Sequence, residues 1–225
     1  MKTQTKEMQA SLTPTQAIEL LMDGNKRFIG NLKLNRNLLQ QVNETAEGQH
    51  PFAFILSCID SRTSAELIFD QGLGDIFSCR IAGNVINEDI LGSMEFACKL
   101  AGSKVIVVLG HTRCGAVKGA CDNVKMGNLT GLLDKLKPVI EQNKNQNTNG
   151  GSHTYHYPDT IAKLNVKYVM EQIPEHSDIL ADMLAKGQIA IVGGLYEVET
   201  GKVEFYERPA GGEKSATKKQ EFKVK

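Results

Sequence analysis

Two short motifs combine residue types that bind metal ions and move protons. Cys58-Ile59-Asp60-Ser61-Arg62 comes first, and His111-Thr112-Arg113-Cys114-Gly115 follows it, with 52 residues between Cys58 and His111. Two thiols and one imidazole are ligands that suit Zn²⁺, and three protein ligands leave one tetrahedral position for water. The first motif adds an aspartate and an arginine. The combination indicates a metal-activated hydroxide with its own hydrogen-bond acceptor, and therefore an enzyme.

The aspartate and the arginine suit that role as a pair. Asp60 can accept a hydrogen bond from a bound hydroxide and so orient it. Arg62 keeps Asp60 ionised through a charge-assisted pair. The alternative is an ordinary surface ion pair, which would contribute little to stability. The closeness of both residues to Cys58 favours the catalytic role.

Two apolar runs are expected to position the motifs. Phe52–Leu56 and Val105–Leu109 are short and continuously apolar, which is typical of strands buried on both faces of a parallel sheet. Gly110 is expected to end the second strand. Ligands of such sheets collect beyond the carboxyl ends of the strands, where loops from different strands meet. Cys58, His111 and Cys114 are therefore expected to meet at one edge.

Further strands and helices alternate along the chain. This alternation predicts an α/β fold, in which a mostly parallel central β-sheet is flanked by helices, with an amino-terminal helical arm. We expect further strands at 76–81, 188–195 and 203–206, and helices at 13–29, 86–100, 116–124, 132–142, 161–171 and 178–185. Residues 31–49 are expected to form an irregular connector with a short helix, and residues 143–152 a surface loop.

Length and composition favour a single domain. The chain has 225 residues, of which 41% are hydrophobic and 23% charged, enough apolar surface for one sizeable core. We expect a flexible amino terminus at residues 1–12, a single α/β domain at 13–207 and a Lys-rich, disordered tail at 208–225. The 26 basic and 26 acidic residues balance, so nucleic acid is not an expected partner.

Other features bear on location and redox state. The apolar stretches are far shorter than the roughly 20 residues that span a membrane. The first residues lack the apolar segment of a secretory signal. We therefore expect a cytoplasmic protein with no membrane partner. The five cysteines are an odd number, which argues against a disulfide framework and for reduced thiols.

The remaining cysteines and histidines are not expected to bind metal. Cys79, Cys98 and Cys121 lie on strand or helix patterns away from the strand ends, and they suit burial as small hydrophobic residues. The other histidines are interpreted as surface or packing residues, although His50 is close enough in sequence to touch the site: they are His50, His153, His156 and His176.

The motifs together resemble the signature of the beta class of carbonic anhydrases. The resemblance extends to Gly24-Asn25-Lys26-Arg27-Phe28, to Arg80-x-Ala82-Gly83-Asn84 and to the strand before His111. It covers roughly residues 13 to 207. Both the residue types and the spacing of Cys58 and His111 match, so the resemblance is specific.

The resemblance implies an activity and a role for each matching residue. Members of the family are lyases that reversibly hydrate carbon dioxide to bicarbonate and a proton, by attack of zinc-bound hydroxide, with one Zn²⁺ per protomer. On this basis Cys58, His111 and Cys114 are the zinc ligands. Asp60 and Arg62 form the catalytic dyad beside the metal.

Substrate contacts follow from the same resemblance. Gln49 matches a glutamine that orients bicarbonate, and the Gly115 amide matches a donor to the substrate oxygen. Phe77, Ala82 and Ile68 are expected to supply an apolar wall. Family members build the site at a dimer interface and tetramers are common. We therefore expect a homodimer or homotetramer in which some of these residues act across the interface.

The sequence also departs from the family pattern. Phe96 stands where many plant-like members have tyrosine, so a hydroxyl near the site is missing. Ile55 stands where members with a regulatory bicarbonate pocket have tryptophan, so inhibition of that kind is expected to be absent. Two thiolate ligands cancel the formal charge of Zn²⁺. Bound water is then less acidic than in the three-histidine carbonic anhydrase, where its pKa is about 7, and activity is expected to rise toward alkaline pH.

Three alternatives remain open on the sequence alone. A structural zinc site would need a fourth protein ligand, for which Asp60 is the candidate. Relatives of the family hydrolyse carbon disulfide or carbonyl sulfide with the same metal chemistry, and pocket access would set that choice. A redox protein using Cys58 and Cys114 is weaker, because the chain has no Cys-x-x-Cys pair.

Overall fold

A five-stranded sheet is the frame of the molecule within the part of the chain that the structure describes, residues 3–146 and 157–206 of this computed structural model. The strand order is β2-β1-β3-β4-β5, in which the first four strands run parallel and β5 runs antiparallel to β4. The strands are β1 (Ala53–Ser57), β2 (Ile76–Arg80), β3 (Val105–His111), β4 (Ala190–Tyr196) and β5 (Val203–Phe205). The predicted α/β class with a mostly parallel sheet is confirmed.

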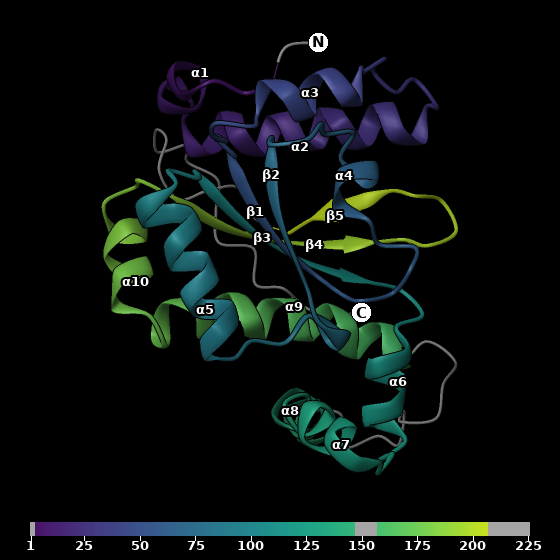
Figure 1. Cartoon of the computed structure of the whole chain (residues 1–225). Helices are drawn as coiled ribbons and strands as arrows, with labels where there is room; N and C mark the ends of the chain where they lie inside the picture. Colours follow the sequence, from purple (N-terminus) through teal and green to yellow (C-terminus); the bar gives the residue numbers. More distant parts are fainter. Residues whose placement is uncertain (1–2, 147–156, 207–225) are drawn as a thin grey trace, which may run out of the picture.

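Helices cover both faces of the sheet (Figure 1). α2 and α4 pack on one face, α5, α9 and α10 pack on the other, and α6 to α8 lie beyond the carboxyl ends of the strands. The helical elements are α1 (Lys6–Ser11), α2 (Pro14–Ile29), α3 (Leu38–Glu44), α4 (Ala65–Ile68), η1 (Ala82–Asn84), α5 (Glu88–Glu95), η2 (Phe96–Leu100), α6 (Gly115–Cys121), α7 (Gly127–Asp134), α8 (Lys137–Gln146), α9 (Tyr157–Glu175) and α10 (Asp178–Ala185).

The two central strands have no solvent-facing side. Every residue of β1 and of β3 is buried. Ile55 and Val107 pack in the layer that contains α2, whereas Leu56 and Ile106 pack in the layer that contains α9. Because side chains alternate between the two faces of a strand, both sets must be apolar. This explains the continuous apolar runs in the sequence.

The helix predicted from residue 13 to residue 29 is confirmed as α2. The Thr13 hydroxyl accepts a hydrogen bond from the Gln16 amide, and the Gln16 side chain accepts one from the Thr13 amide, which completes a capping box. Pro14 occupies the first turn, where its missing N–H costs nothing. The inward face of α2 then buries apolar side chains against the sheet.

The Gly24–Arg27 segment of α2 ties this helix to the rest of the domain. A Cβ at Gly24 would lie 1.7 Å from the Phe69 carbonyl oxygen, so only glycine allows this close approach. The buried Asn25 side chain donates to the carbonyl oxygens of Ile68 at 3.1 Å and Gly201 at 2.9 Å. These contacts join α2 to α4 and to the turn between β4 and β5.

The predicted end of the strand at Gly110 is wrong by two residues. β3 continues through Gly110, paired with Leu195, to His111, paired with Tyr196. A Cβ at Gly110 would lie 2.6 Å from the Val166 Cγ2 atom of α9. Glycine is therefore needed here for the close approach of a helix, and it does not break the strand.

The prediction of a flexible amino terminus over residues 1–12 is wrong for residues 6–11, which form α1. Thr5 caps this helix by accepting a hydrogen bond from the Met8 amide. The buried Gln9 side chain donates to the carbonyl oxygens of Pro51 and Ala101, each at 2.7 Å. Gln9 thus anchors α1 by hydrogen bonding to two backbone carbonyl groups of the domain. The polar composition of this segment did not reveal this contact.

Other element boundaries also differ from the predictions. The helix expected at 86–100 is α5 followed by the π-helical turn η2, and the helix expected at 132–142 is divided between α7 and α8. The expected loop at 143–152 begins inside α8, while its later residues and the expected tail at 208–225 lie outside the described residues. The short α4 was not predicted.

No helix among the described residues is both long and apolar enough to cross a membrane. The cytoplasmic location and the absence of a nucleic-acid partner stay predictions.

A buried ion cluster holds the connector after α2. The Asp70 carboxylate, 3% exposed, lies 2.5 Å from Arg27 Nε and 2.5 Å from Arg36 Nη1. It also accepts a hydrogen bond from the Leu34 amide at 3.2 Å. Burial acts to raise the pKa of Asp70, but the hydrogen bonds from Arg27 and Arg36 outweigh it and hold the pKa below its ordinary value.

Replacing Asp70 with Asn is expected to lower the free energy of unfolding by about 3 kcal/mol at pH 7, because the buried Arg36 loses its counter-charge. Since the folded-state pKa is lowered, the stabilisation is full above the ordinary carboxyl pKa of about 3.9 and is lost as pH falls through the folded value. The difference between the two proteins in urea unfolding should therefore shrink below about pH 4.

Asp23→Asn is the matched control, because Asp23 pairs with Lys26 on the surface, where both side chains are more than half exposed. Its effect should be small. A pH-independent difference for Asp70→Asn, or one as small as that of the control, would contradict the assignment.

Candidate metal centre

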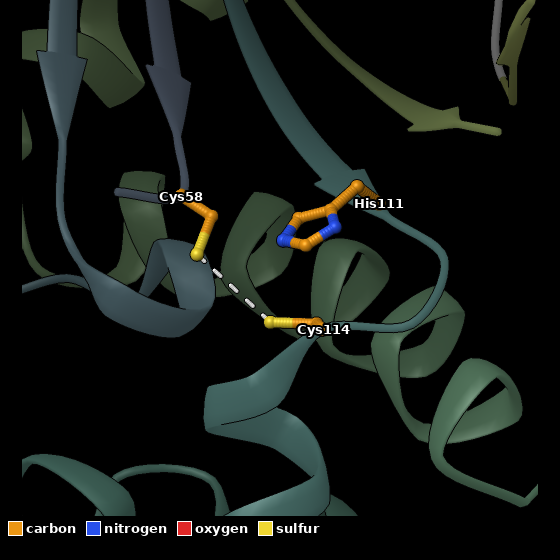
Figure 2. A group of neighbouring side chains, drawn as sticks. All are labelled: Cys58, His111 and Cys114. Carbon is orange, nitrogen blue, oxygen red and sulfur yellow. Dashed lines mark hydrogen bonds between the residues drawn. The ribbon is translucent and has the colours of Figure 1, made fainter. Parts of the chain in front are cut away.

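Three buried side chains meet beyond the carboxyl ends of β1 and β3 (Figure 2). Cys58 follows β1, His111 is the last residue of β3, and Cys114 precedes α6. One ligand atom from each lies within 4.8 Å of the other two, and the two sulfur atoms are 3.9 Å apart. The exposed fractions are 3%, 1% and 2%, respectively. The structure thus brings together the three residues that the sequence predicted to meet.

His111 presents one ring nitrogen to this group. Its Nδ1–H donates to the Thr112 carbonyl oxygen at 2.9 Å, which leaves Nε2 as the lone-pair nitrogen. Nε2 is buried and has no hydrogen-bond partner. A buried nitrogen without a partner is costly, and a metal-binding histidine usually donates its other N–H to a backbone carbonyl in this way. The ring is therefore prepared to bind a cation through Nε2.

The two thiols are electrostatically coupled. Their mutual hydrogen bond lowers the pKa of Cys58 to about 4 and raises that of Cys114 above its ordinary value. The Gly83 amide donates to the Cys58 sulfur at 3.4 Å, which further stabilises a thiolate there. Two buried thiolates this close would repel each other. A divalent cation would allow both to ionise, so the donor set fits zinc.

Asp60 and Arg62 form a bidentate pair beside the sulfurs. Arg62 Nε and Nη2 donate to the two carboxylate oxygens of Asp60 at 2.9 and 2.8 Å, and the Arg62 amide donates to Oδ1 at 3.0 Å. The guanidinium of Arg62 holds the pKa of Asp60 well below its ordinary value. With its carboxylate engaged by Arg62, Asp60 does not join the group of ligand atoms.

The loop that carries Cys58 and Asp60 is held through its carbonyl oxygens. Thr63 Oγ1 donates to the carbonyl oxygens of Cys58 at 2.9 Å and Asp60 at 2.8 Å. Arg80, at the end of β2, donates to the same two oxygens at 3.0 and 2.5 Å. The arginine of the Arg80-x-Ala82-Gly83-Asn84 motif therefore orders the ligand loop from the neighbouring strand.

An apolar layer surrounds the sulfur atoms. Cys58 and Cys114 belong to a cluster of buried side chains from η1, α6, α7, α8 and α9 and their flanking residues. Its other buried members are Val85, Val117, Leu133, Leu136, Val139, Ile140, Ile161 and Ala162. Such surroundings limit water and suit an uncharged, apolar substrate.

Two of the residues expected to contact substrate flank the ligands. Gly115 directly follows Cys114 and begins α6. Ala82 begins η1 and precedes Gly83, whose amide contacts the Cys58 sulfur. Ile68 lies in the core on the α2 side of the sheet, where it is 1% exposed. Its packing there does not indicate a role in the site wall.

The structure does not bring Gln49 and Phe77 to the ligands of the same chain. Gln49 precedes β1 and lies near Gly74, at the amino ends of the strands, so the length of β1, about 16 Å at 3.3 Å per residue, separates it from Cys58. Phe77 lines a surface pocket with Phe96, their ring centroids 6.2 Å apart. None of the three ligands lines that pocket.

The other cysteines lie outside the ligand group. Burial raises the pKa of Cys79, that of Cys98 to about 12 and that of Cys121 to about 11. These thiols therefore stay protonated at neutral pH. Among the described residues, His50 and His176 are also outside the group of ligand atoms, and His153 and His156 lie outside the described part of the chain.

Sequence reasoning missed Asn165, which contacts Gly83 next to the Cys58 sulfur. This α9 residue is 1% exposed, and its side chain donates to the Gly83 carbonyl oxygen at 2.9 Å. It therefore steadies the residue whose amide contacts the Cys58 sulfur. The available signal was a polar residue at an inward position of a helix, between Ala162 and Val166.

Comparison with known proteins places the chain in one family. The family model described as "Carbonic anhydrase" matches residues 53–203. Carbonic anhydrase 2 of Mycobacterium tuberculosis is 35% identical over 192 residues, which cover 84% of this chain and 91% of the relative. A carbonic anhydrase of Mycolicibacterium smegmatis is 34% identical over 200 residues, with coverage of 85% and 93%.

Solved structures show the same fold. The beta-carbonic anhydrase CafA of Aspergillus fumigatus has a TM-score of 0.67 at 27% identity, over 85% of this chain and 91% of that one. One of two tetrameric beta-carbonic anhydrases from Sordaria macrospora has a TM-score of 0.66 at 21% identity, over 84% and 96%. The matched motifs, the buried Cys-His-Cys group and these comparisons agree: the chain belongs to the carbonic anhydrase family and is an enzyme of its beta class.

Proposed function

We propose that the chain catalyses the reversible hydration of carbon dioxide to bicarbonate and a proton, with one Zn²⁺ per protomer bound by Cys58, His111 and Cys114. The observation that carries the proposal is the buried group of three ligand atoms, in which His111 Nε2 has no other partner. Membership of the family supports the same activity.

The bound cation would supply the nucleophile, by making water acidic enough to lose a proton near neutral pH. Asp60 accepts a hydrogen bond from the nucleophile and directs a lone pair toward the carbon atom of the substrate. Arg62 keeps Asp60 ionised and fixes its orientation. The Gly115 amide donates to an oxygen of the substrate, and the apolar layer beside Ala82 admits carbon dioxide and limits water.

The ligand set also bears on the pH dependence. Two thiolates donate more negative charge to a cation than two imidazoles do. Water bound to such a cation would be less acidic. We therefore expect the rate of carbon dioxide hydration to rise toward alkaline pH. Asp60 offsets part of this effect by stabilising the deprotonated nucleophile.

A purely structural zinc site is disfavoured by the position of Asp60. Such a site needs four protein ligands, and the described residues supply three that meet. The candidate for the fourth is held by Arg62 in a bidentate pair. An open position for the substrate is the arrangement that these contacts support.

We further propose that the complete site needs two chains. Gln49 and Phe77 lie away from the ligands of their own chain, and Phe77 packs edge-to-face with the exposed Phe96 in a surface pocket. In a homodimer these residues would reach the site of the partner. The relative from Sordaria macrospora described as tetrameric supports assembly of copies.

Zinc content tests the ligand assignment directly. Wild-type protein should contain about one Zn²⁺ per chain, and Cys58→Ser and His111→Ala proteins should contain much less, as measured by elemental analysis after dialysis. Cys98→Ser is the matched control, because Cys98 is buried outside the ligand group. Full zinc content in Cys58→Ser would contradict the assignment.

Hydration kinetics test the role of Asp60. Asp60→Asn should lower kcat/KM for carbon dioxide by about 100-fold, the size expected when an oriented hydrogen-bonding group is lost from a reaction centre. Its zinc content should not change, since Asp60 is not among the ligands. Asp122→Asn, a surface change in the pair with Lys118, is the control for stopped-flow assays. Near-normal hydration by Asp60→Asn would refute the role.

Subunit mixing tests whether Gln49 acts across an interface. Cys58→Ser and Gln49→Ala chains are each expected to be weak. If Gln49 serves the partner's site, each mixed dimer contains one intact site, so random reassembly of equal amounts should restore roughly a quarter of the wild-type activity. Reassembled mixtures no more active than the average of the two parents would show that Gln49 does not act in the partner's site.

A further inference from the structure

The segment His111–Cys114 carries two of the three ligands, and the β4–β5 hairpin holds it in place. The Thr112 amide donates to the Tyr196 carbonyl oxygen at 3.0 Å. The Thr112 hydroxyl donates to Glu197 Oε1 at 2.8 Å and accepts a hydrogen bond from the Val198 amide at 3.1 Å. Thr112 is 7% exposed, and its hydroxyl is thus used both as a donor and as an acceptor.

Glu197 is itself oriented by the hairpin. Its Oε1 atom also accepts a hydrogen bond from the Glu199 amide at 3.2 Å. Its own amide donates to the Lys202 carbonyl oxygen at 2.8 Å, and its carbonyl oxygen accepts from the Gly201 amide at 2.8 Å. These two backbone hydrogen bonds hold Glu197 in the hairpin, so its carboxylate stays next to the Thr112 hydroxyl.

Glu197 influences His111 through the backbone carbonyl group of Thr112. The Thr112 carbonyl oxygen accepts the hydrogen bond from His111 Nδ1 at 2.9 Å. That bond selects the tautomer and the ring orientation that leave Nε2 free. If Thr112 rotates, the carbonyl oxygen leaves the ring and the imidazole loses its constraint. Glu197, Thr112 and His111 thus form a continuous chain of contacts that ends at the proposed metal ligand.

A second contact holds the other half of the segment. The Arg113 amide donates to Asp159 Oδ1 of α9 at 2.6 Å, and Arg113 has a φ of +55°. The Arg113 N–H and the Thr112 carbonyl belong to one planar peptide group, so the Asp159 contact also helps to orient the carbonyl oxygen. Asp159 acts on this peptide group from α9, and Glu197 holds the Thr112 side chain from the β4–β5 hairpin.

We propose that Glu197 is a positioning residue of the metal centre: it holds Thr112 so that the Thr112 carbonyl fixes His111 with Nε2 directed to Zn²⁺. The inference rests on the proposed zinc site and adds to it a residue 86 positions away from His111 in the sequence. Among the described residues, Glu197 is not part of the group of ligand atoms. It acts on zinc affinity through Thr112.

The test measures the zinc dissociation constant of the full-length protein by competition with a chelator. Glu197→Ala and Thr112→Val should each raise it about tenfold, the lower end of the range for outer partners of metal ligands. The zinc dissociation constant of the double variant should be no higher than that of the single variant that binds zinc more weakly, because both changes remove the same hydrogen bond. Glu197→Gln retains an acceptor oxygen and should stay near the wild-type value.

Glu204→Gln is the matched control, since this residue lies on the same hairpin with a 64% exposed side chain, paired with Lys163. It should leave zinc affinity unchanged. The absorption spectrum of cobalt-substituted Glu197→Ala should also differ from that of wild type, because the orientation of the imidazole changes. Melting of the zinc-free proteins separates a general loss of stability from an effect on the metal.

Two results would overturn the inference. Zinc affinity within twofold of wild type in Glu197→Ala, even with lower zinc-free stability, would show that the contact serves the fold alone. If Glu197→Ala does not fold, Thr112→Val, which keeps the side-chain shape, decides by the same criterion. Wild-type protein that takes up no zinc would instead remove the proposed function, and this inference with it.

Discussion

The parallel pairing of β1 with β3 is the constraint on which the site depends. Ser57 lies opposite Leu109, so Cys58 and His111 emerge from adjacent strands at the same edge of the sheet. A shift of one residue in this register would turn every side chain of one strand to the opposite face. Because both strands are buried throughout, no polar face marks the register, and it is set by the close fit of individual side chains in the two apolar layers. Core packing therefore sets the positions of the ligands.

Around this frame, backbone groups and polar side chains direct the donor atoms. The Gly83 amide contacts the Cys58 sulfur, and the Thr112 carbonyl oxygen contacts the His111 ring. Arg80 and Thr63 hold the first ligand loop through its carbonyl oxygens. Burial in an apolar layer disfavours thiolates, so both thiols would ionise together only beside a cation such as the proposed Zn²⁺.

The single chain accounts for the ligands and the Asp60–Arg62 pair, but it leaves Gln49 at the opposite end of the strands from Cys58. Exposed apolar side chains also lie on the helical arm, among them Leu38 and Leu39, and Phe96 is exposed beside Phe77. A site divided between two chains would reconcile these positions with the roles expected from the family. It would also couple the activity of the enzyme to its assembly.

The sequence by itself identified the three candidate ligands and the main strands along the chain. Cys58, His111 and Cys114 were identifiable because each follows a short apolar run that is typical of a buried strand. Local patterns could not reveal that Gly110 admits a helix, that Gln9 anchors α1, or that Asn165 and Glu197 support the ligands. Those features depend on contacts between residues far apart in the chain, and a side chain's partner is known only when packing has brought the two together. Tertiary structure alone therefore decided which polar groups surround the candidate metal site and which predicted contacts lie beyond the reach of one chain.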